Sequence, residues 1–404
     1  MVSKVISIIG GGAAGCFCAV QIKRRCPDAK VIVYEAQSKL MSKLAVTGGG
    51  RCNITNTFEG IGSLKEVYPR GDRLIKAAFH HLSPSETIWW WENEGVKLVA
   101  QEDGCVFPKS QDAMQVVRKL EELMRESGVE IMCSHRVEAI NRMEDSTFEL
   151  RFNGKVSQYA DIVVLTSGGG ALSMLNTLNG IALEPTAPSL FTFKIKDESF
   201  TSLMGTVVDN ATLSFSGTKF RSRGTLLITD WGVSGPATLK LSSYAAYYLK
   251  DSAYKATLLI NYLSLSETEI RALIFETCEY NAQRMMANAP LPGLTSRMWG
   301  FLMSRAGLRS DIRWAELGSK GLNRLVNTLI ADPYQVDGRC RFKDEFVTAG
   351  GVSATEVNPN TLESKHFPGL YFAGEVLDID AITGGFNLQA AWSTAYTVAR
   401  AVVG

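Results

Sequence analysis

The chain has 404 residues, of which 46% are hydrophobic and 21% are charged, and its formal net charge at pH 7 is +1. This composition is typical of globular proteins, and the length suggests two or three domains. The near-neutral charge and the lack of a basic run predict that neither nucleic acid nor an anionic membrane surface is a partner. Since no apolar stretch approaches the ~20 residues that a membrane span needs, we expect no membrane segment.

The N-terminal residues and the cysteines predict a cytoplasmic protein. The chain starts directly with an apolar strand and lacks the basic and long apolar regions of a secretory signal. Eight cysteines are scattered without a C-x-x-C pair, which argues against a disulfide reductase or a zinc ribbon and favours a reducing compartment. With only four histidines we expect no metal site, and we interpret His80-His81 as a helix end.

The first 35 residues carry a dinucleotide-binding fingerprint. An apolar run over 4–9 is followed by Gly10-Gly11-Gly12-Ala13-Ala14-Gly15, and a second apolar run over 31–34 ends in Glu35. In this pattern the first glycine permits a tight turn, Gly12 lets the backbone approach a pyrophosphate, and Gly15 lets the helix lie close to the strand. The helix N-terminus attracts the phosphates. Glu35 can accept hydrogen bonds from both ribose hydroxyls, and it would repel a 2′-phosphate.

Further along, capping and turn signals predict a series of short elements. Ser83-Pro84-Ser85-Glu86 is a capping box for a helix that ends before Gly95, and Ser110 is expected to cap a helix that stops at Gly128. The tryptophans at 89–91 lie on the first of these helices, either as a ligand platform or divided between the core and an interdomain seam. Asn153-Gly154 predicts a hairpin within a three-stranded meander whose last part, 161–165, re-enters the main sheet.

The composition changes after residue 184. Pro185-Thr186-Ala187-Pro188 looks like a linker, residues 189–262 are strand-like with one helix near 236–249, and residues 263–330 have a helical pattern. We therefore expect an α/β nucleotide-binding domain over 1–188 and 346–404. It is interrupted by a β-rich insert over 189–262 and 331–345 and by a helical sub-domain over 263–330.

Three more glycine-rich segments are candidates for cofactor contacts. The sequence from 43 to 53 supplies Lys43, Thr47, Gly48, Gly49, Gly50, Arg51, Cys52 and Asn53. The end of the re-entering strand supplies Ser167, Gly168 and Gly169, and the C-terminal segment supplies Gly374, Glu375, Asp378, Gly384, Gly385, Asn387 and Leu388. In an open α/β sheet, ligands bind at the carboxyl ends of the strands. The loop at 47–50 suits a dinucleotide longer than NAD, and Asp378 can bind a sugar-alcohol chain.

The last helix, expected over 388–402, offers a further contact. Its N-terminus supplies N–H groups and a partial positive charge, which would stabilise an anionic reduced flavin if it faced the N1–C2=O edge. Arg51 could polarise a substrate carbonyl, or it could pair with the cofactor phosphates, which we favour. Cys52 adjoins this loop, but a redox role would need a resolving partner, and none is nearby in sequence.

Together with G-x-G-x-x-G, the motifs TGGGRCNITN, TSGGG, WGVSGPA, TAGGVS and GLYFAGEVLDIDAITGGFN resemble the BaiN-like FAD flavoproteins, a family also described as aminoacetone-oxidase-like or bile-acid-dehydro-reductase-like. The resemblance runs from residue 1 to residue 404. It implies a glutathione-reductase-like FAD-binding domain interrupted by a β-barrel-like domain with a helical insertion. It also implies that Glu35 holds the adenosine ribose and that Val137 lies beside the adenine. The chain departs from the wider superfamily at Ser167, where Thr is common.

The resemblance implies hydride transfer through flavin N5 and reduction of a C=C bond conjugated to a ketone, for example in a steroid-like molecule. NAD(P)H is the expected transient electron donor, although no second G-x-G-x-x-G exists for a nicotinamide domain. The catalytic proton donor is unknown, because nothing selects one of the twelve tyrosines. Two alternatives remain open. They are an amine or aminoketone oxidase that uses O₂, and a flavin-bound sensor or RNA-modification partner. The oligomeric state is not predicted.

Overall fold

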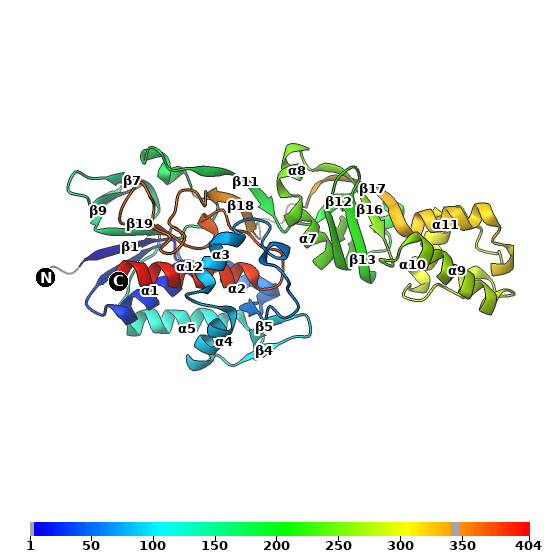
Figure 1. The fold of residues 1–404 in the computed structure, drawn as a ribbon, viewed down its shortest axis with the longest axis horizontal. Helices are drawn as coiled ribbons and strands as arrows, with labels where there is room; N and C mark the ends of the chain where they lie inside the picture. Colours follow the sequence, from blue (N-terminus) through cyan, green and yellow to red (C-terminus); the bar gives the residue numbers. More distant parts are fainter. Residues whose placement is uncertain (1–3, 171, 341–346) are drawn as a thin grey trace. The chain divides into compact units, whose positions relative to one another are not determined.

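The computed structural model describes residues 4–170, 172–340 and 347–404, and the chain divides into two compact units (Figure 1). Unit 1 comprises Met1–Ala187 and Val347–Gly404, and unit 2 comprises Pro188–Phe346. Unit 1 contains the glycine-rich fingerprint and both chain ends, so the N- and C-terminal parts of the sequence form one folded body.

A five-stranded parallel sheet forms the centre of unit 1. Its strand order is β19 (Leu370–Phe372), β10 (Ile162–Leu165), β1 (Val5–Ile9), β2 (Lys30–Tyr34) and β6 (Glu130–Met132). The central strands are almost continuously apolar and buried, as parallel strands covered on both faces must be. The carboxyl ends of β1 and β10 lie side by side, since Ile9 pairs with Leu165.

Helices and a small antiparallel sheet cover the central sheet. The helices α1 (Ala13–Arg25), α5 (Ala113–Glu126) and α12 (Phe386–Val403) belong to one layer, in which α1 packs against both others. The meander of β7 (Val137–Arg142), β8 (Phe148–Phe152) and β9 (Lys155–Ala160) contacts β1. The turn expected at Asn153-Gly154 joins β8 to β9, with Gly154 at φ 64°. The return of 161–165 to the main sheet, as β10, is also confirmed.

Shorter elements complete unit 1. They are α2 (Ser42–Gly50), β3 (Thr55–Asn56), η1 (Leu64–Glu66), α3 (Asp72–Phe79), α4 (Pro84–Asn93), β4 (Leu98–Ala100), β5 (Cys105–Pro108), η2 (Leu172–Thr177), β11 (Leu183–Ser189), β18 (Val347–Val352) and η5 (Gly374–Val376). The capping box of α4 is confirmed, and His80 caps the end of α3. Trp90 and Trp91 are buried and Trp89 is exposed, so two of the three tryptophans belong to the core.

One local expectation is wrong and a second is right only in part. Asp112, not Ser110, caps α5, because the Asp112 carboxylate accepts the N–H of Met114 at 2.9 Å. The proline-rich segment expected as a linker contains the boundary between the two units, between Ala187 and Pro188, but locally it is part of β11, which pairs with β18 in a two-stranded sheet. Proline is tolerated there because an edge strand leaves some N–H positions unpaired.

Unit 2 is a closed six-stranded barrel with a helical extension. The barrel order is β12 (Phe193–Ile195), β15 (Gly232–Ser234), β14 (Arg221–Thr229), β13 (Val207–Phe215), β16 (Lys255–Asn261) and β17 (Asp332–Arg339). The short helix α6 (Glu198–Thr201) precedes β13. The helix expected near 236–249 is two helices, α7 (Pro236–Tyr244) and α8 (Ala246–Asp251), separated at Ala245.

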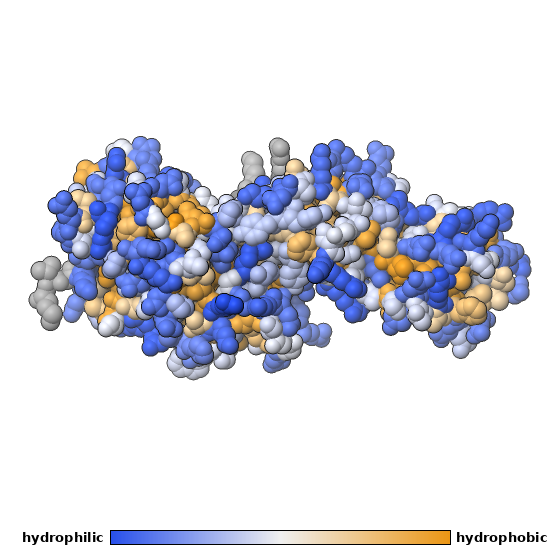
Figure 2. All heavy atoms as spheres, turned by 45° about the horizontal axis from the view of Figure 1, so that its top comes forward, coloured by the Kyte–Doolittle hydropathy of each residue, from blue (hydrophilic) through white to orange (hydrophobic). Residues whose placement is uncertain are grey.

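The chain between β16 and β17 forms the helical extension. It contains α9 (Glu267–Asn281), η3 (Met286–Asn288), α10 (Ser296–Arg305), η4 (Trp314–Glu316) and α11 (Ser319–Ala331). Barrel and helices share one hydrophobic core. In the face that Figure 2 shows, hydrophobic side chains appear in small groups among hydrophilic ones. Within the described ranges, no helix combines the length and the apolar character that crossing a membrane requires.

Candidate dinucleotide-binding site

The turn between β1 and α1 has one glycine position that faces open space. A Cβ atom on Gly10, at φ 110°, would lie 2.6 Å from the Thr166 carbonyl oxygen, and one on Gly15 would lie 2.0 Å from the Gly10 carbonyl oxygen. Apart from Gly12 itself and its chain neighbours, no heavy atom of the described residues lies within 4 Å of the position that a Cβ on Gly12 would take. The fold itself therefore requires glycine at 10 and 15, whereas Gly12 leaves room for a group outside the chain to approach the backbone.

The N–H groups at the start of α1 point out of the helix. The first intrahelical hydrogen bond runs from the Cys16 N–H to the Gly12 carbonyl at 3.0 Å, so the N–H groups of Ala13, Ala14 and Gly15 have no partner within the helix. Three such donors and the positive end of the helix dipole suit an anion such as a pyrophosphate.

Glu35 stands at the end of β2, beside this turn. Its Oε2 accepts the Gly11 N–H at 2.8 Å and its Oε1 accepts the Gln37 N–H at 2.7 Å. Each oxygen keeps a further acceptor site, and both can receive a ribose hydroxyl. Val137 is buried at the start of β7, two residues after His135, whose N–H donates to the Glu35 carbonyl at 2.8 Å. The predicted adenine neighbour and the predicted ribose ligand thus lie at the same end of the site.

The segment 47–50 leaves the helical conformation within α2. Thr47 has ψ 147°, and Gly48, Gly49 and Gly50 have φ values of 59°, 69° and 83°. Beyond its own chain neighbours, a Cβ on Gly49 or Gly50 would meet no atom of the described residues within 4 Å. The Nε of Arg51 donates to the Gly48 carbonyl at 3.2 Å, and its guanidinium lies 4.4 Å from the centre of the Phe107 ring. Arg51 remains exposed, so its charge is available to a ligand.

Cys52 and Asn53 face the protein instead. Burial raises the pKa of the Cys52 thiol to about 12, so a reactive thiolate is disfavoured there. With its amide in the orientation that satisfies its neighbours, Asn53 accepts the Gly385 N–H at 3.1 Å and donates to the carbonyls of Thr55 and Val106 at 2.9 and 3.2 Å. Asn53 therefore holds the start of α12 beside the glycine loop.

Glu375 connects three of the predicted segments. Its Oε1 accepts the Thr348 N–H at 2.8 Å, and its Oε2 lies 3.4 Å from the Nζ of Lys43. The same Oε2 would lie 3.5 Å from a Cβ on Gly168. Gly169 lies so close to Thr348 that a Cβ would come within 2.4 Å of it. The Oγ of Ser167 is buried and has no hydrogen-bond partner among the described residues.

Asp378 is half-buried, and its Oδ1 accepts the Gly350 N–H at 3.1 Å. Burial is the largest influence on this carboxyl and raises its pKa, an effect that nearby Arg70 opposes. Arg70 forms an ion pair with the fully buried Asp380. A half-buried carboxyl with a raised pKa, here just after η5, is a candidate ligand-binding position.

The N-terminus of α12 lies against this group of segments. A Cβ on Gly385 would lie 2.2 Å from the Thr55 carbonyl oxygen, so only glycine permits this approach. The first intrahelical bond joins the Gln389 N–H to the Gly385 carbonyl at 3.0 Å, which leaves the N–H groups of 386–388 without helical partners. The Asn387 side chain pairs with the backbone of Ala381 at 2.9 Å in both directions, and so shapes the preceding turn.

The contacts bring all four predicted segments together within unit 1. Gly10 contacts Thr166, Gly374 lies against Ala14, Glu375 faces Lys43 and Gly168, and Gly385 bonds Asn53. The open positions at Gly12, Gly49 and Gly50 and the unpaired Ser167 hydroxyl fit a long polar cofactor such as FAD, because they leave room and donors for it. The assignment of individual contacts to this cofactor stays a prediction.

Some residues that shape the candidate site were not predicted from the sequence. Thr348 and Gly350 donate their N–H groups to Glu375 and Asp378, and the Thr166 hydroxyl donates to the carbonyls of Ile9 and Gly10 at 3.1 and 2.8 Å. The sequence signal for this part of β18 was the Gly350-Gly351 pair, whose φ values in the structure are 87° and 135°. No comparable signal pointed to Arg70.

Sequence comparisons found relatives that match over the full length. The chain is 29% identical to the 3-dehydro-bile acid delta(4,6)-reductase of Clostridium scindens, with 98% of each chain covered. It is 28% identical to the ribosomal RNA dihydrouridine synthases of Haemophilus influenzae and Escherichia coli, over 98% of this chain and 97% of each relative. Because two of these names refer to RNA, the expectation of no nucleic-acid partner stays a prediction.

Solved structures share the fold at low sequence identity. The 3-ketosteroid delta1-dehydrogenase of Sterolibacterium denitrificans matches with a TM-score of 0.51 at 13% identity, covering 99% of this chain and 100% of that one. The fumarate reductase subunit FrdA of E. coli matches with a TM-score of 0.50 at 13% identity, covering 99% of this chain and 70% of that one. The predicted fold class, a Rossmann-type FAD-binding domain interrupted by a β-barrel, is confirmed.

The family model described as the HI0933-like protein Rossmann domain matches residues 4–401, nearly the whole chain. The resemblance to BaiN-like flavoproteins is therefore confirmed. The chain belongs to the HI0933-like family and is an FAD-dependent oxidoreductase.

Proposed function

We propose that this protein reduces a C=C bond conjugated to a carbonyl group, with FAD as its bound cofactor and NAD(P)H as the electron donor. The observation that carries the proposal is the chemistry shared by relatives with different substrates. A 3-oxo bile acid with double bonds at positions 4 and 6 is a conjugated ketone. Uridine likewise has a C5=C6 bond conjugated to the C4 carbonyl. Both names describe saturation of such a bond.

When bound, FAD would supply a hydride through N5. Glu35 would hold the ribose hydroxyls, and the N–H groups at the start of α1 would hold the pyrophosphate. Glu375 and Asp378 are the carboxylates available for the polyol part of the cofactor, and Asp378 is held in place by the Gly350 N–H at 3.1 Å. The fit of this set rests on the open Gly12 position, where a Cβ would meet no described atom within 4 Å except those of its chain neighbours.

The start of α12 supports reduction chemistry. Its unpaired N–H groups over 386–388 stabilise negative charge at this end of the helix, by about 0.3–1 kcal/mol at exposed sites and ~2 kcal/mol in partly buried ones. The bonds of Asn53 and Asn387 fix this helix end in place. A fixed donor set of this kind favours the anionic reduced form of a flavin over a neutral form.

The sequence has a single G-x-G-x-x-G fingerprint, and it forms the turn between β1 and α1 of unit 1. NAD(P)H would therefore deliver its hydride without a nucleotide-binding domain of its own. We assign Glu35 to the ribose of FAD and not to the ribose of the electron donor. Its repulsion of a 2′-phosphate therefore does not indicate whether NADH or NADPH is the donor.

The test is a stopped-flow experiment on protein that releases FAD on denaturation. The protein is reduced anaerobically with NADH or NADPH and then mixed with a 3-oxo-Δ4,6 steroid, a uridine-containing ribosomal RNA transcript, or the corresponding saturated ketone. We expect one conjugated acceptor to reoxidise the flavin and to gain one hydride and one proton, and the saturated ketone to have no effect. The proposal fails if only O₂ reoxidises the flavin, or if an aminoketone reduces it in place of NAD(P)H.

A further inference from the structure

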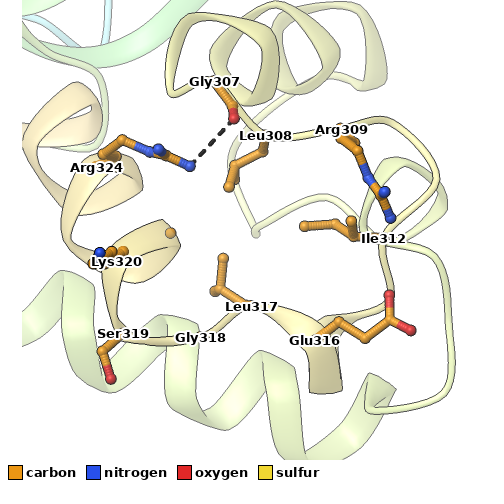
Figure 3. Close-up of a pocket in the computed structure, with 11 residues that line it drawn as sticks. Gly307, Leu308, Arg309, Ile312, Glu316, Leu317, Gly318, Ser319, Lys320 and Arg324 are labelled. Carbon is orange, nitrogen blue, oxygen red and sulfur yellow. Dashed lines mark hydrogen bonds between the residues drawn. The ribbon is translucent and has the colours of Figure 1, made fainter.

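The helical extension of unit 2 contains a hollow that the cofactor does not explain. Its volume is about 470 Å³, and Figure 3 shows it between the chain around Gly307–Ile312 and the start of α11. It is lined by Gly307, Leu308, Arg309, Ile312, Glu316, Leu317, Gly318, Ser319, Lys320, Gly321 and Arg324. None of the residues predicted to contact FAD lines it, and the volume falls in the range of small-molecule sites, roughly 300–1,000 Å³.

The charge around this hollow is positive. Arg309, Lys320 and Arg324 line it, against the single carboxylate of Glu316. Arg324 donates through Nη2 to the Gly307 carbonyl at 3.3 Å, which holds its guanidinium across the hollow (Figure 3). Arg309 has a partner in Asp311 at 3.1 Å. No carboxylate in the described part of the chain forms an ion pair with Lys320 or Arg324.

Backbone donors add to these side chains. The first intrahelical bond of α11 runs from the Leu322 N–H to the Gly318 carbonyl at 3.0 Å. The N–H groups of Ser319, Lys320 and Gly321 therefore have no acceptor within the helix. Gly318 supplies no side-chain cap, and the first turn of α11 has no acidic residue. Beyond its chain neighbours, a Cβ on Gly318 would meet none of the described atoms within 4 Å, so a ligand can approach this backbone.

The rest of the lining is apolar. Leu308, Ile312 and Leu317 are among its lining residues and pack onto the hydrophobic core of unit 2. Cations and helix N–H groups beside an apolar wall match the two halves of a nucleotide, a phosphate and a base with its sugar. The helical extension also exposes two aromatic side chains of α9, Phe275 at 66% and Tyr280 at 81%, which are available for base stacking.

We propose that this hollow binds one nucleotide of an RNA chain, with Lys320, Arg324 and the start of α11 holding its phosphate. The proposal rests on the proposed function, whose conjugated substrate would then be a uridine within RNA. The alignment with the two ribosomal RNA dihydrouridine synthases spans 98% of this chain and so extends into this helical extension. A net charge of +1 did not indicate such a site, because it sums over 404 residues and hides a local excess.

The test measures RNA binding directly, with a fluorescently labelled single-stranded RNA and the FAD-loaded protein. The double variant Lys320→Ala and Arg324→Ala should lower the affinity at least tenfold. Its log affinity should also fall less steeply with log salt, by roughly 0.7 for each lost phosphate contact. The matched control, Lys219→Ala and Arg221→Ala, removes one lysine and one arginine that are exposed in the barrel, and should change the affinity less than the test pair.

A further variant separates binding from folding. Ser319→Asp places a carboxylate at the start of α11, where it favours the helix but repels a phosphate. We expect an unchanged or higher melting temperature together with weaker RNA binding. Equal RNA affinities for the test and control pairs would overturn the inference, and so would competition by free UMP or inorganic phosphate as strong as that by RNA.

Reduction of a small conjugated ketone distinguishes this inference from the proposed function. We expect the double variant to reduce the ketone at the wild-type rate. If the double variant binds RNA as tightly as wild type and the ketone is reduced, only the RNA site is refuted. If wild type reduces neither the ketone nor RNA although RNA binding depends on the hollow, the proposed reaction is refuted and the binding site is supported.

Discussion

Replacing Gly12 by alanine should weaken FAD binding while leaving the FAD-free fold almost unchanged. Gly12 has φ −83° and ψ −168°, a conformation open to any residue, and within 4 Å a Cβ there would meet only its chain neighbours among the described residues. The added methyl group would instead point into the space that we assign to the pyrophosphate. The effect on the cofactor should therefore appear without an effect on folding.

The two expected free energies differ in size. Alanine lowers the entropy of the unfolded chain, a gain of about 0.4–1 kcal/mol, and it is a poorer N-cap than glycine, a loss of about 0.5 kcal/mol. The free energy of unfolding of the FAD-free protein should thus change by less than about 1 kcal/mol. Losing one hydrogen bond to a charged phosphate costs about 1.5–3 kcal/mol, which corresponds to a roughly tenfold or greater rise in the Kd for FAD.

Gly15→Ala is the matched control, because its Cβ would lie 2.0 Å from the Gly10 carbonyl oxygen. Forcing this contact should destabilise the FAD-free protein by about 1–3 kcal/mol. Urea unfolding of the stripped protein gives the stability, and titration of flavin fluorescence gives the Kd. Wild-type FAD affinity in Gly12→Ala, or destabilisation as large as that in Gly15→Ala, would refute the division of roles between the two glycines.

Four further outcomes follow from the burial of single groups. Because burial raises the pKa of Asp378, its folded form binds a proton more tightly than its unfolded form, and this contribution to stability is lost as pH rises through the folded pKa. In urea unfolding of FAD-free protein, Asp378→Asn should therefore gain stability relative to wild type at pH 7, and the gain should shrink on acidification. Asp332 accepts the Tyr262 hydroxyl at 2.9 Å and pairs with Arg305 at 2.9 Å, so Asp332→Ala should lower the free energy of unfolding by about 3–5 kcal/mol in the same assay. Tyr262→Phe should cost only about 1 kcal/mol. Cys52, with a pKa of about 12, should resist iodoacetamide at pH 8 in the native protein while partly exposed cysteines react, as peptide mass spectrometry would show.

Local signals predicted the fold well where one short segment determines the structure. The capping box at Ser83 and the Asn153-Gly154 turn each contain within a few residues the groups that they need. The segment 185–188 joins the two units, but its strand conformation was not predicted because its pairing partner, β18, lies more than 150 residues later. A strand of this kind is stabilised by long-range pairing that proline-rich local sequence does not reveal.

The candidate site shows the same limit at the level of single side chains. The spacing of the glycines predicted where a ligand could approach the backbone, because the G-x-G-x-x-G motif assigns that role to a particular glycine. Residue type could not tell whether a polar group is already engaged. Asn53 and Asn387 were predicted as cofactor contacts, yet their amides bond the protein's own backbone, while the hydroxyl of Ser167 has no described partner.

This division changes how substitutions at the site should be interpreted. Removing the amide of Asn387 takes two 2.9 Å hydrogen bonds from the turn at Ala381, so it would displace the start of α12 and alter FAD binding indirectly. Removing the Ser167 hydroxyl takes no bond from the protein, so any loss of FAD affinity there would report a direct contact. Stability of the FAD-free protein separates the two cases, because only the first substitution should lower it.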